Sequence, residues 1–261
     1  MSNDTIVFDD GAAYERYMGV WSRLVGQAFL DWVAPSPNLR WLDVGCGNGA
    51  FTQMIVDRCS PADVQGIDPS AEQLAFARSQ PGLQAAKFQI GDAMALPFPD
   101  DSFDVAVMPL VIFFVPVPAK GVAEMVRVVS PGGTVAAYAW DVVGRAFPYQ
   151  SLWDALQEIG VLAPVEPSRD ASRLDVMRDL WTTAGLTAVE TREFTVQRTF
   201  ASFDEYWTTI LGGPSASKKF AAMAPADIAT VRSRMKDRLP TDASGRITYS
   251  ARANAVKGRV G

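Results

Sequence analysis

The stretch Trp41-Leu-Asp-Val-Gly-Cys-Gly-Asn-Gly-Ala50 decides the fold, because an apolar run breaks there into three alternating glycines. Its first four residues are typical of the end of a buried strand, with Asp43 as a carboxylate at the tip. The glycines at positions 45, 47 and 49 allow a tight turn in which no Cβ keeps a ligand from the backbone. Apolar residues then recur at helical spacing from Phe51 to Cys59. Strand, glycine turn and helix in this order predict the nucleotide-binding end of a doubly wound sheet.

Strands and helices alternate through the first half of the chain. This alternation implies right-handed crossovers and a mainly parallel sheet. The expected helices cover residues 12–33, 70–79 and 118–129, and the expected strands begin near residue 39 and cover 64–68, 86–90, 103–108 and 134–140.

The second half of the chain is less regular. Residues 141–170 contain aromatic residues and several prolines, which suggest an irregular cap. A helix is expected over 173–184, and residues 203–239 look mostly helical with a break at Gly212-Gly213-Pro214. Alternating apolar residues predict strands over 187–199 and 245–257. The order of the strands in the sheet does not follow from these patterns.

Composition excludes several classes of function. With 24 basic and 29 acidic residues, the net charge of −5 argues against a nucleic-acid partner. The longest apolar run, Val105 to Val117, contains two prolines and is too short for a membrane span. Cys46 and Cys59 have no metal-binding spacing, so we expect no metal and a reduced, cytoplasmic setting. Histidine is absent, which removes the commonest general base.

The glycine turn alone leaves the nucleotide open. Residues 45–50 also satisfy the dinucleotide pattern GxGxxG/A. Asp68, at the end of the second expected strand, fits ribose recognition for either kind of nucleotide, because its two oxygens can accept hydrogen bonds from both ribose hydroxyls. An NAD(P)-dependent oxidoreductase is therefore one reading of this turn.

Four spaced blocks point to another cofactor. They are Leu42-Asp-Val-Gly-Cys-Gly-Asn-Gly49, Gly66-Ile-Asp-Pro-Ser70, Gly91-Asp-Ala93 with Leu96-Pro-Phe-Pro-Asp-Asp-Ser-Phe-Asp104, and Arg127-Val-Val-Ser-Pro-Gly-Gly133. With these blocks the chain resembles the class I S-adenosylmethionine-dependent methyltransferases. Within them it is most similar to the small-molecule (methyltransferase type 11) enzymes near the ubiquinone/menaquinone C-methyltransferases. The resemblance covers about residues 38–141, and the later blocks disfavour the oxidoreductase.

The resemblance implies a single α/β domain over residues 1–261. Its fold would be a Rossmann-like, doubly wound, seven-stranded sheet, mainly parallel with an antiparallel last strand and helical cap insertions. Residues 1–37 would form an N-terminal helical cover and residues 38–140 the cofactor-binding core. Residues 141–170 and 200–243 would be the substrate-cap insertions.

The resemblance also assigns a role to each matching residue. Asp43 would hold the ammonium of the methionyl group, and the backbone around Gly45, Cys46 and Gly47 would lie against the methionyl and ribose parts. Asp68 would bind the ribose hydroxyls and Pro69 the adenine face. Asp92 would accept a hydrogen bond from the adenine amino group, and the Ala93 amide would face a ring nitrogen. The expected cofactor-binding residues are Tyr17, Trp21, Arg23, Asp43, Gly45, Cys46, Gly47, Asp68, Pro69, Asp92, Ala93, Met108 and Pro109.

The N-terminal residues have two readings. Tyr14, Tyr17 and Trp21 resemble an entry segment that covers the cofactor, with Arg23 available to the methionyl carboxylate. They are equally explained as the buried stripe of an amphipathic helix, with Arg23 in solvent.

No catalytic residue follows from the sequence. Asp141, at the carboxyl end of the fifth expected strand, is a possible base, and Tyr138 and Tyr149 are further candidates. A structural or solvent-facing role explains each of the three better than a catalytic one. The expected acceptor is a small apolar or aromatic molecule methylated at carbon or oxygen. The aromatic residues expected around it are Phe113, Phe114, Phe147, Trp153, Tyr206 and Trp207. A non-catalytic protein that binds S-adenosylmethionine or S-adenosylhomocysteine is the remaining alternative.

Overall fold

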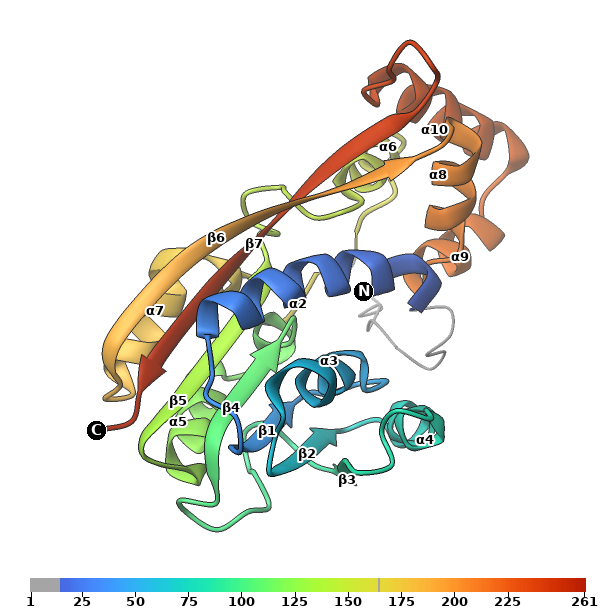
Figure 1. Cartoon of the computed structure of the whole chain (residues 1–261). Coiled ribbons are helices and arrows are strands. Elements are labelled where there is room, and N and C mark those ends of the chain that lie inside the picture. Colours follow the sequence, from blue (N-terminus) through green and yellow to red (C-terminus); the bar gives the residue numbers. More distant parts are fainter. Residues whose placement is uncertain (1–14, 164) are drawn as a thin grey trace.

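The computed structural model describes residues 15–163 and 165–261, so Tyr14 lies outside the described residues. The described chain forms one seven-stranded sheet in the order β3-β2-β1-β4-β5-β7-β6 (Figure 1). The first five strands are parallel, whereas β7 is antiparallel to both of its neighbours. The strands are β1 (Arg40–Val44), β2 (Asp63–Asp68), β3 (Lys87–Ile90), β4 (Phe103–Pro109), β5 (Val129–Trp140), β6 (Thr187–Phe200) and β7 (Ile247–Arg259).

Helices cover both faces of the sheet. The main helices are α2 (Val20–Val33), α3 (Ala50–Cys59), α4 (Ala71–Ser79), α5 (Pro118–Val128), α6 (Gln150–Gln157), α7 (Leu174–Thr183), α8 (Phe203–Leu211), α9 (Pro214–Ala221) and α10 (Pro225–Arg238). Short turns of other helix types are η1 (Glu15–Gly19), η2 (Ile112–Phe114) and η3 (Arg169–Ser172).

Strand alternation divides the core into two clusters. Trp41 and Tyr138 point to the face that α2 and α3 cover, and they belong to a cluster that continues into α6, α8 and α10. Leu42 and Ala137 point to the opposite face, where α5 and α7 pack. Because successive side chains of a strand alternate between faces, Asp43 lies on the α2 and α3 side of the sheet.

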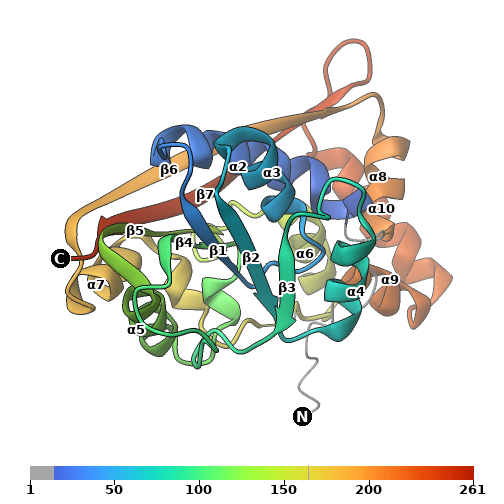
Figure 2. The same cartoon turned by 60° about the horizontal axis from the view of Figure 1, so that its bottom comes forward.

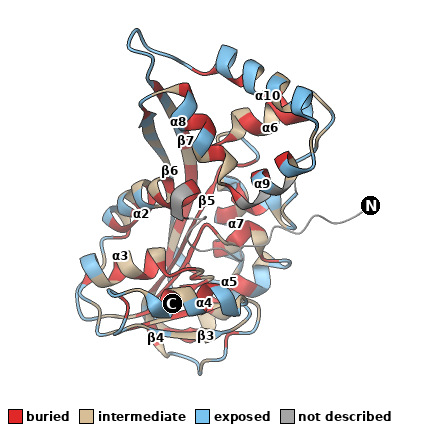
Figure 3. Cartoon of the chain, turned by 90° about the vertical axis from the view of Figure 1, so that its right-hand side faces the viewer, coloured by how far each residue is buried: buried red, intermediate tan, exposed pale blue. Residues whose placement is uncertain are grey.

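A long ribbon formed by β6 and β7 extends beyond the parallel strands and carries α8, α9 and α10 (Figure 1). Aromatic residues fill its contact with the core: the rings of Trp21 and Tyr249 lie 6.4 Å apart, and those of Tyr149 and Tyr206 lie 6.0 Å apart. Figure 3 shows buried residues along the strands, while much of α10 is exposed. The ribbon and its helices are thus packed onto the carboxyl-terminal side of the sheet through an aromatic core.

The expected fold class is confirmed, including the antiparallel last strand. Two local expectations are wrong. The segment 141–170, expected to be irregular, contains α6, whose Leu152, Ala155 and Leu156 recur at helical spacing and are buried. The fifth strand begins at Val129, ahead of the Pro-Gly-Gly sequence, because Val129 pairs with Phe103 of β4.

No helix in the described ranges is long and apolar enough to cross a membrane. Within the same ranges, no three His, Cys, Asp or Glu residues gather closely enough to hold a metal ion.

Candidate functional site

The glycine turn is tied to the end of the neighbouring strand. The backbone N–H groups of Gly45 and Cys46 both donate to the carbonyl oxygen of Ile67, at 2.8 and 2.9 Å. The turn closes when the Gly49 N–H donates to the Cys46 carbonyl oxygen at 2.9 Å. These bonds hold the carboxyl ends of β1 and β2 together (Figure 2). A ligand at this edge of the sheet therefore meets both strands at once.

Two of the glycines differ in what surrounds them. Gly45 has a φ of +75°, and a Cβ at this position would lie 2.6 Å from a methyl group of Val111. Gly47 has a φ of +52°, but no described atom lies within 4 Å of the position of its missing Cβ. Packing therefore requires glycine at position 45. At position 47 the backbone stays open, as a ligand lying against the turn requires.

Asp43 is a fully buried carboxylate with one oxygen unsatisfied. Its Oδ2 accepts a hydrogen bond from the Thr52 hydroxyl at 2.7 Å, whereas Oδ1 has no hydrogen-bond partner among the described residues. Burial, opposed by the hydrogen bond from Thr52 and helped by the charge of Asp68, raises the pKa of Asp43 to about 7. A buried carboxylate oxygen without a partner is costly unless a cation or donor reaches it. The site is therefore suited to an ammonium group.

Asp68 is held in place at the end of β2 by two backbone bonds. Its Oδ2 accepts from the Gly47 N–H at 3.0 Å, and its Oδ1 accepts from the Ser70 N–H at 2.8 Å. Burial raises the pKa of Asp68, and the two backbone bonds lower it. Each carboxylate oxygen keeps a second lone pair. Asp68 can therefore receive two neighbouring hydroxyl groups without moving.

Exposed apolar side chains lie beside Asp68. Pro69 follows it directly and is exposed. Ile90 pairs with Asp68 in the sheet register and is 63% exposed, which is unusual for a large aliphatic residue. Ile90 is not among the residues expected at the site, although its place directly before Gly91 and Asp92 is a signal that the sequence carries. Pro69 and Ile90 offer an apolar surface suited to a flat ring.

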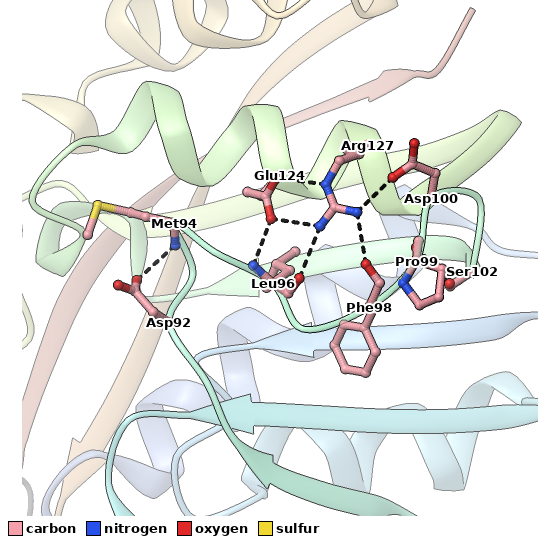
Figure 4. Close-up of polar contacts among 9 residues, drawn as sticks. All are labelled: Asp92, Met94, Leu96, Phe98, Pro99, Asp100, Ser102, Glu124 and Arg127. Carbon is pink, nitrogen blue, oxygen red and sulfur yellow. Dashed lines mark hydrogen bonds and ion pairs between the residues drawn. The ribbon is translucent and has the colours of Figure 1, made fainter.

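Asp92 lies in an exposed tight turn after β3. Its Oδ1 accepts from the Met94 N–H at 2.8 Å (Figure 4). Its carbonyl oxygen accepts from the Ala95 N–H at 3.0 Å. The turn is next to the sheet edge because the Gly91 N–H donates to the Asp68 carbonyl oxygen at 3.2 Å. Ala93 is half-buried within the same turn. Asp68, Asp92 and Ala93 thus lie on adjoining segments.

The end of β4 contributes backbone rather than side chains. Met108 is fully buried in the cluster on the α5 side, so its side chain points away from the face of Asp43. Pro109 is also buried. Leu110 has a φ of +61°, a conformation that is uncommon for a residue with a Cβ, and its N–H donates to the Tyr138 carbonyl oxygen at 2.7 Å. This turn places Val111 against the glycine turn.

The N-terminal aromatic residues belong to the core. The Trp21 indole N–H donates to the Tyr149 hydroxyl at 3.1 Å, and this hydroxyl donates to the Tyr17 carbonyl oxygen at 2.6 Å. The rings of Tyr17 and Tyr149 stack at 4.4 Å, and Arg23 is exposed on α2. These contacts support the reading of Tyr17 and Trp21 as a buried stripe.

The three possible bases are all held by contacts within the fold. Asp141 accepts from the Arg252 guanidinium at 2.6 and 3.0 Å and from the Gly144 N–H at 2.8 Å. Tyr138 lies in the aromatic core, 4.7 Å from the ring of Phe29. Burial raises the pKa of Tyr149 to about 12. None of the three is arranged as a general base.

The aromatic residues expected around the acceptor do not form one group. Phe113 and Phe114 pack with the cluster on the α5 side, whereas the other four pack with the cluster on the α2 side. These six residues therefore pack as parts of two hydrophobic clusters, and a lining formed by all of them stays a prediction. Cys46 is buried and burial raises the pKa of its thiol, which argues against a nucleophilic role.

Comparison with known proteins agrees with this geometry. Residues 42–137 match the family model described as a methyltransferase domain. The chain is 42% identical over 131 residues to 2-methyl-6-phytyl-1,4-hydroquinone methyltransferase 2 of Oryza sativa subsp. japonica, covering 50% of this chain and 36% of that protein. It is 35% identical over 153 residues to demethylmenaquinone methyltransferase of Renibacterium salmoninarum, covering 57% of this chain and 61% of that protein. Residues 42–137 thus resemble a methyltransferase domain, and both of these curated relatives are methyltransferases.

A solved structure extends the comparison to the fold. The YcgJ protein from Bacillus subtilis superposes with a TM-score of 0.59 at 18% identity, over 90% of this chain and 97% of that one. At this identity the likeness concerns the fold alone. The matched part of the chain also spans less than two thirds of either curated methyltransferase.

The substitution Asp43→Asn is expected to stabilise the ligand-free protein at pH 8. The folded-state pKa of about 7 lies above the unfolded value of 3.8, so the folded state binds protons more tightly and stability falls as pH rises through this window. Replacing the charged carboxylate with a neutral amide should raise the unfolding free energy at pH 8 by about 1 to 2 kcal/mol. The gain comes from the raised pKa, at about 1.4 kcal/mol per unit, and the unpaired N–H donors of the new amide reduce it. Urea unfolding at pH 8 and pH 5 measures this.

The matched control is Asp63→Asn, because Asp63 pairs with Lys87 at 2.8 Å and its pKa is lowered. Asp63→Asn should not stabilise the protein at pH 8. A loss of stability in Asp43→Asn at pH 8 would contradict the account of Asp43.

The substitutions Gly45→Ala and Gly47→Ala should have different consequences. Both place a Cβ at positive φ, which costs about 1 kcal/mol. Only Gly45→Ala also collides with Val111, so it should lower the melting temperature much more. Gly47→Ala should fold but lose cofactor affinity, because its methyl group enters the open side of the turn. Thermal unfolding and titration with S-adenosylhomocysteine separate the two effects, and unchanged affinity in Gly47→Ala would count against the assignment.

Proposed function

We propose that the protein transfers a methyl group from S-adenosylmethionine to a small-molecule acceptor at carbon or oxygen. The observation that carries this proposal is the unsatisfied Oδ1 of Asp43, a buried acceptor directly before an open glycine turn. In this proposal Asp43 receives the ammonium of the methionyl group and Asp68 receives the ribose hydroxyls. The adenine lies between Pro69, Ile90 and the turn of Asp92 and Ala93.

The bound cofactor supplies a methyl group already activated on a sulfonium, so the protein positions the acceptor and excludes water. Orientation of this kind is worth about 7 to 11 kcal/mol in well-aligned pairs. Asp141 and Tyr149 are engaged in structural contacts, and the chain has no histidine. Because these side chains are not placed to act as a general base, we propose an acceptor that is already nucleophilic or ionises readily.

The names of the relatives suggest which acceptors to test first. One acts on a methyl-phytyl-hydroquinone and another on demethylmenaquinone, as their names state. Electron-rich rings bearing hydroxyl groups meet the requirement for a nucleophilic acceptor. We therefore propose quinols and phenols as the first acceptors to test, followed by small carboxylates.

We further propose that the segments after β4 and β5, together with α6 and the helices on the ribbon, enclose the acceptor. Val111 lies beside the glycine turn, and the aromatic core joins α6 and α8 to the sheet. In this arrangement residues 15–37 cover the cofactor side, and residues 141–170 and 200–243 form the cap. The cytoplasmic setting and the absence of a nucleic-acid partner remain predictions.

Calorimetric titration tests the cofactor assignment. S-adenosylmethionine and S-adenosylhomocysteine should bind, and NAD should not. Asp68→Ala should weaken binding at least about 30-fold, because two charge-assisted hydrogen bonds to the ribose are lost. Asp63→Ala is the control, since Asp63 lies at the opposite end of β2 and pairs with Lys87. Equal affinities in the two variants would remove the ribose assignment.

Incorporation of labelled methyl groups into quinols, phenols and carboxylates tests catalysis. Transfer to any of these acceptors that is lost in Asp43→Asn supports the proposed function. Tight cofactor binding without transfer across the panel would favour the non-catalytic binding protein instead.

A further inference from the structure

The segment 91–102, between β3 and β4, carries the proposed adenine contacts but little regular structure of its own. Its Asp92 turn is followed by Leu96, which is buried in the cluster on the α5 side. Inside the segment, the Phe98 N–H donates to the Leu96 carbonyl oxygen at 2.8 Å, and the Ser102 hydroxyl donates to that of Pro99 at 2.7 Å. These local bonds do not fix the segment to the sheet.

Two residues of α5 attach residues 96–100 of the segment (Figure 4), and Asp101, near its end, bonds to Ser130 and Arg127. Glu124 Oε2 accepts from the Leu96 N–H at 2.7 Å. Arg127 Nη2 donates to the Leu96 carbonyl oxygen at 3.0 Å, and Arg127 Nη1 donates to the Phe98 carbonyl oxygen at 2.8 Å and to Asp100 at 2.8 Å. In the described part of the chain, the hydrogen bonds that join residues 92–100 to other elements all go to Glu124 or Arg127.

The guanidinium of Arg127 is fully used in this arrangement. Its Nε and Nη2 donate to the two oxygens of Glu124, at 2.8 and 2.7 Å. With the three bonds to the segment, all five guanidinium N–H groups have an acceptor. Lysine cannot reproduce this planar set of donors, because its ammonium has three donors on a flexible chain. The ion pair also lowers the pKa of Glu124, so both groups stay charged at neutral pH.

The helix that carries the pair is firmly packed. Val122, Met125 and Val128 of α5 are fully buried against the sheet. The position of the segment is therefore set relative to the sheet by α5. At its other end the segment is attached to β2, through the bond between Gly91 and Asp68.

We propose that Glu124 and Arg127 are positioning residues that set the nucleobase selectivity of the site by fixing the turn of Asp92 and Ala93. They touch neither cofactor nor acceptor and act through the backbone of Leu96. This proposal rests on the proposed function, because it takes the adenine to lie against that turn. This proposal has a specific consequence. Loss of the bonds from Glu124 and Arg127 should reduce the preference for a base with an amino group more than it weakens overall binding.

The test compares S-adenosylhomocysteine with S-inosylhomocysteine, in which a carbonyl oxygen replaces the amino group of the base. The wild-type protein should prefer the adenine compound by at least about tenfold, since the carbonyl cannot donate to Asp92. Arg127→Ala and Arg127→Lys should reduce the preference to less than about threefold. Glu124→Gln should have an intermediate effect, because its amide oxygen can still accept from Leu96. Calorimetric titration of the full chain measures each ratio.

Arg40 offers a matched control at the opposite edge of the sheet. Its guanidinium pairs with Asp104 at 2.8 Å and reaches the Ser130 hydroxyl at 3.0 Å. It meets the segment at Asp101, whose carbonyl oxygen lies 3.4 Å away, at the end far in sequence from the Asp92 turn. Arg40→Ala should lower the melting temperature but keep the nucleobase preference. Hydrogen exchange gives a second readout without any ligand: the Leu96 amide should exchange at least about tenfold faster in Arg127→Ala and stay protected in Arg40→Ala.

An unchanged preference in Arg127→Ala would overturn the proposal, as would an equal loss in Arg40→Ala. Failure of the proposed function itself is recognised separately, because the wild-type protein would then bind neither compound. In that case the positioning role is rejected together with the proposed function. If the wild-type protein prefers the adenine compound and Arg127→Ala keeps that preference, the positioning role alone is rejected.

Discussion

The buried carboxylate of Asp43 is the constraint on which the site depends. One of its oxygens is satisfied by Thr52 and the other has no partner in the described chain. Placing such a group in the interior costs stability, and burial raises its pKa to about 7. We expect such a destabilising carboxylate where a bound ligand offsets the lost stability. The rest of the carboxyl edge is arranged so that a ligand reaching Asp43 also meets Asp68 and the Asp92 turn.

The surrounding structure limits how that ligand lies. The glycine turn is held to β2 through Ile67, and Gly47 N–H fixes the carboxylate of Asp68. On the far side, Glu124 and Arg127 hold the segment that carries Asp92. The proposed positions of the methionyl, ribose and adenine groups are therefore set by three separate attachments to the same sheet. Such preorganisation lowers the entropic cost of binding.

Much of this site could be predicted from the sequence, and the reasons differ by residue. Asp43, Asp68 and the glycines stand at fixed distances from strand ends, so strand periodicity and turn chemistry locate them. Thr52 and Val111 could not be assigned their contacts, because they reach the site through α3 and the turn after β4. The same holds for Asp104, which pairs with Arg40 across 64 residues of sequence. Phe113 and Trp207 also belong to the clusters on opposite faces of the sheet. This separation could not be predicted, because it depends on the order of the strands.

The number of protons released on binding tests the central claim about Asp43 most directly. In the ligand-free protein its pKa of about 7 leaves it largely protonated at pH 6, whereas an ammonium at Oδ1 requires the ionised form. Titration of S-adenosylhomocysteine at pH 6 in buffers of different ionisation enthalpy should show release of close to one proton, and Asp43→Asn should show almost none. Equal proton release by the two proteins would contradict the account.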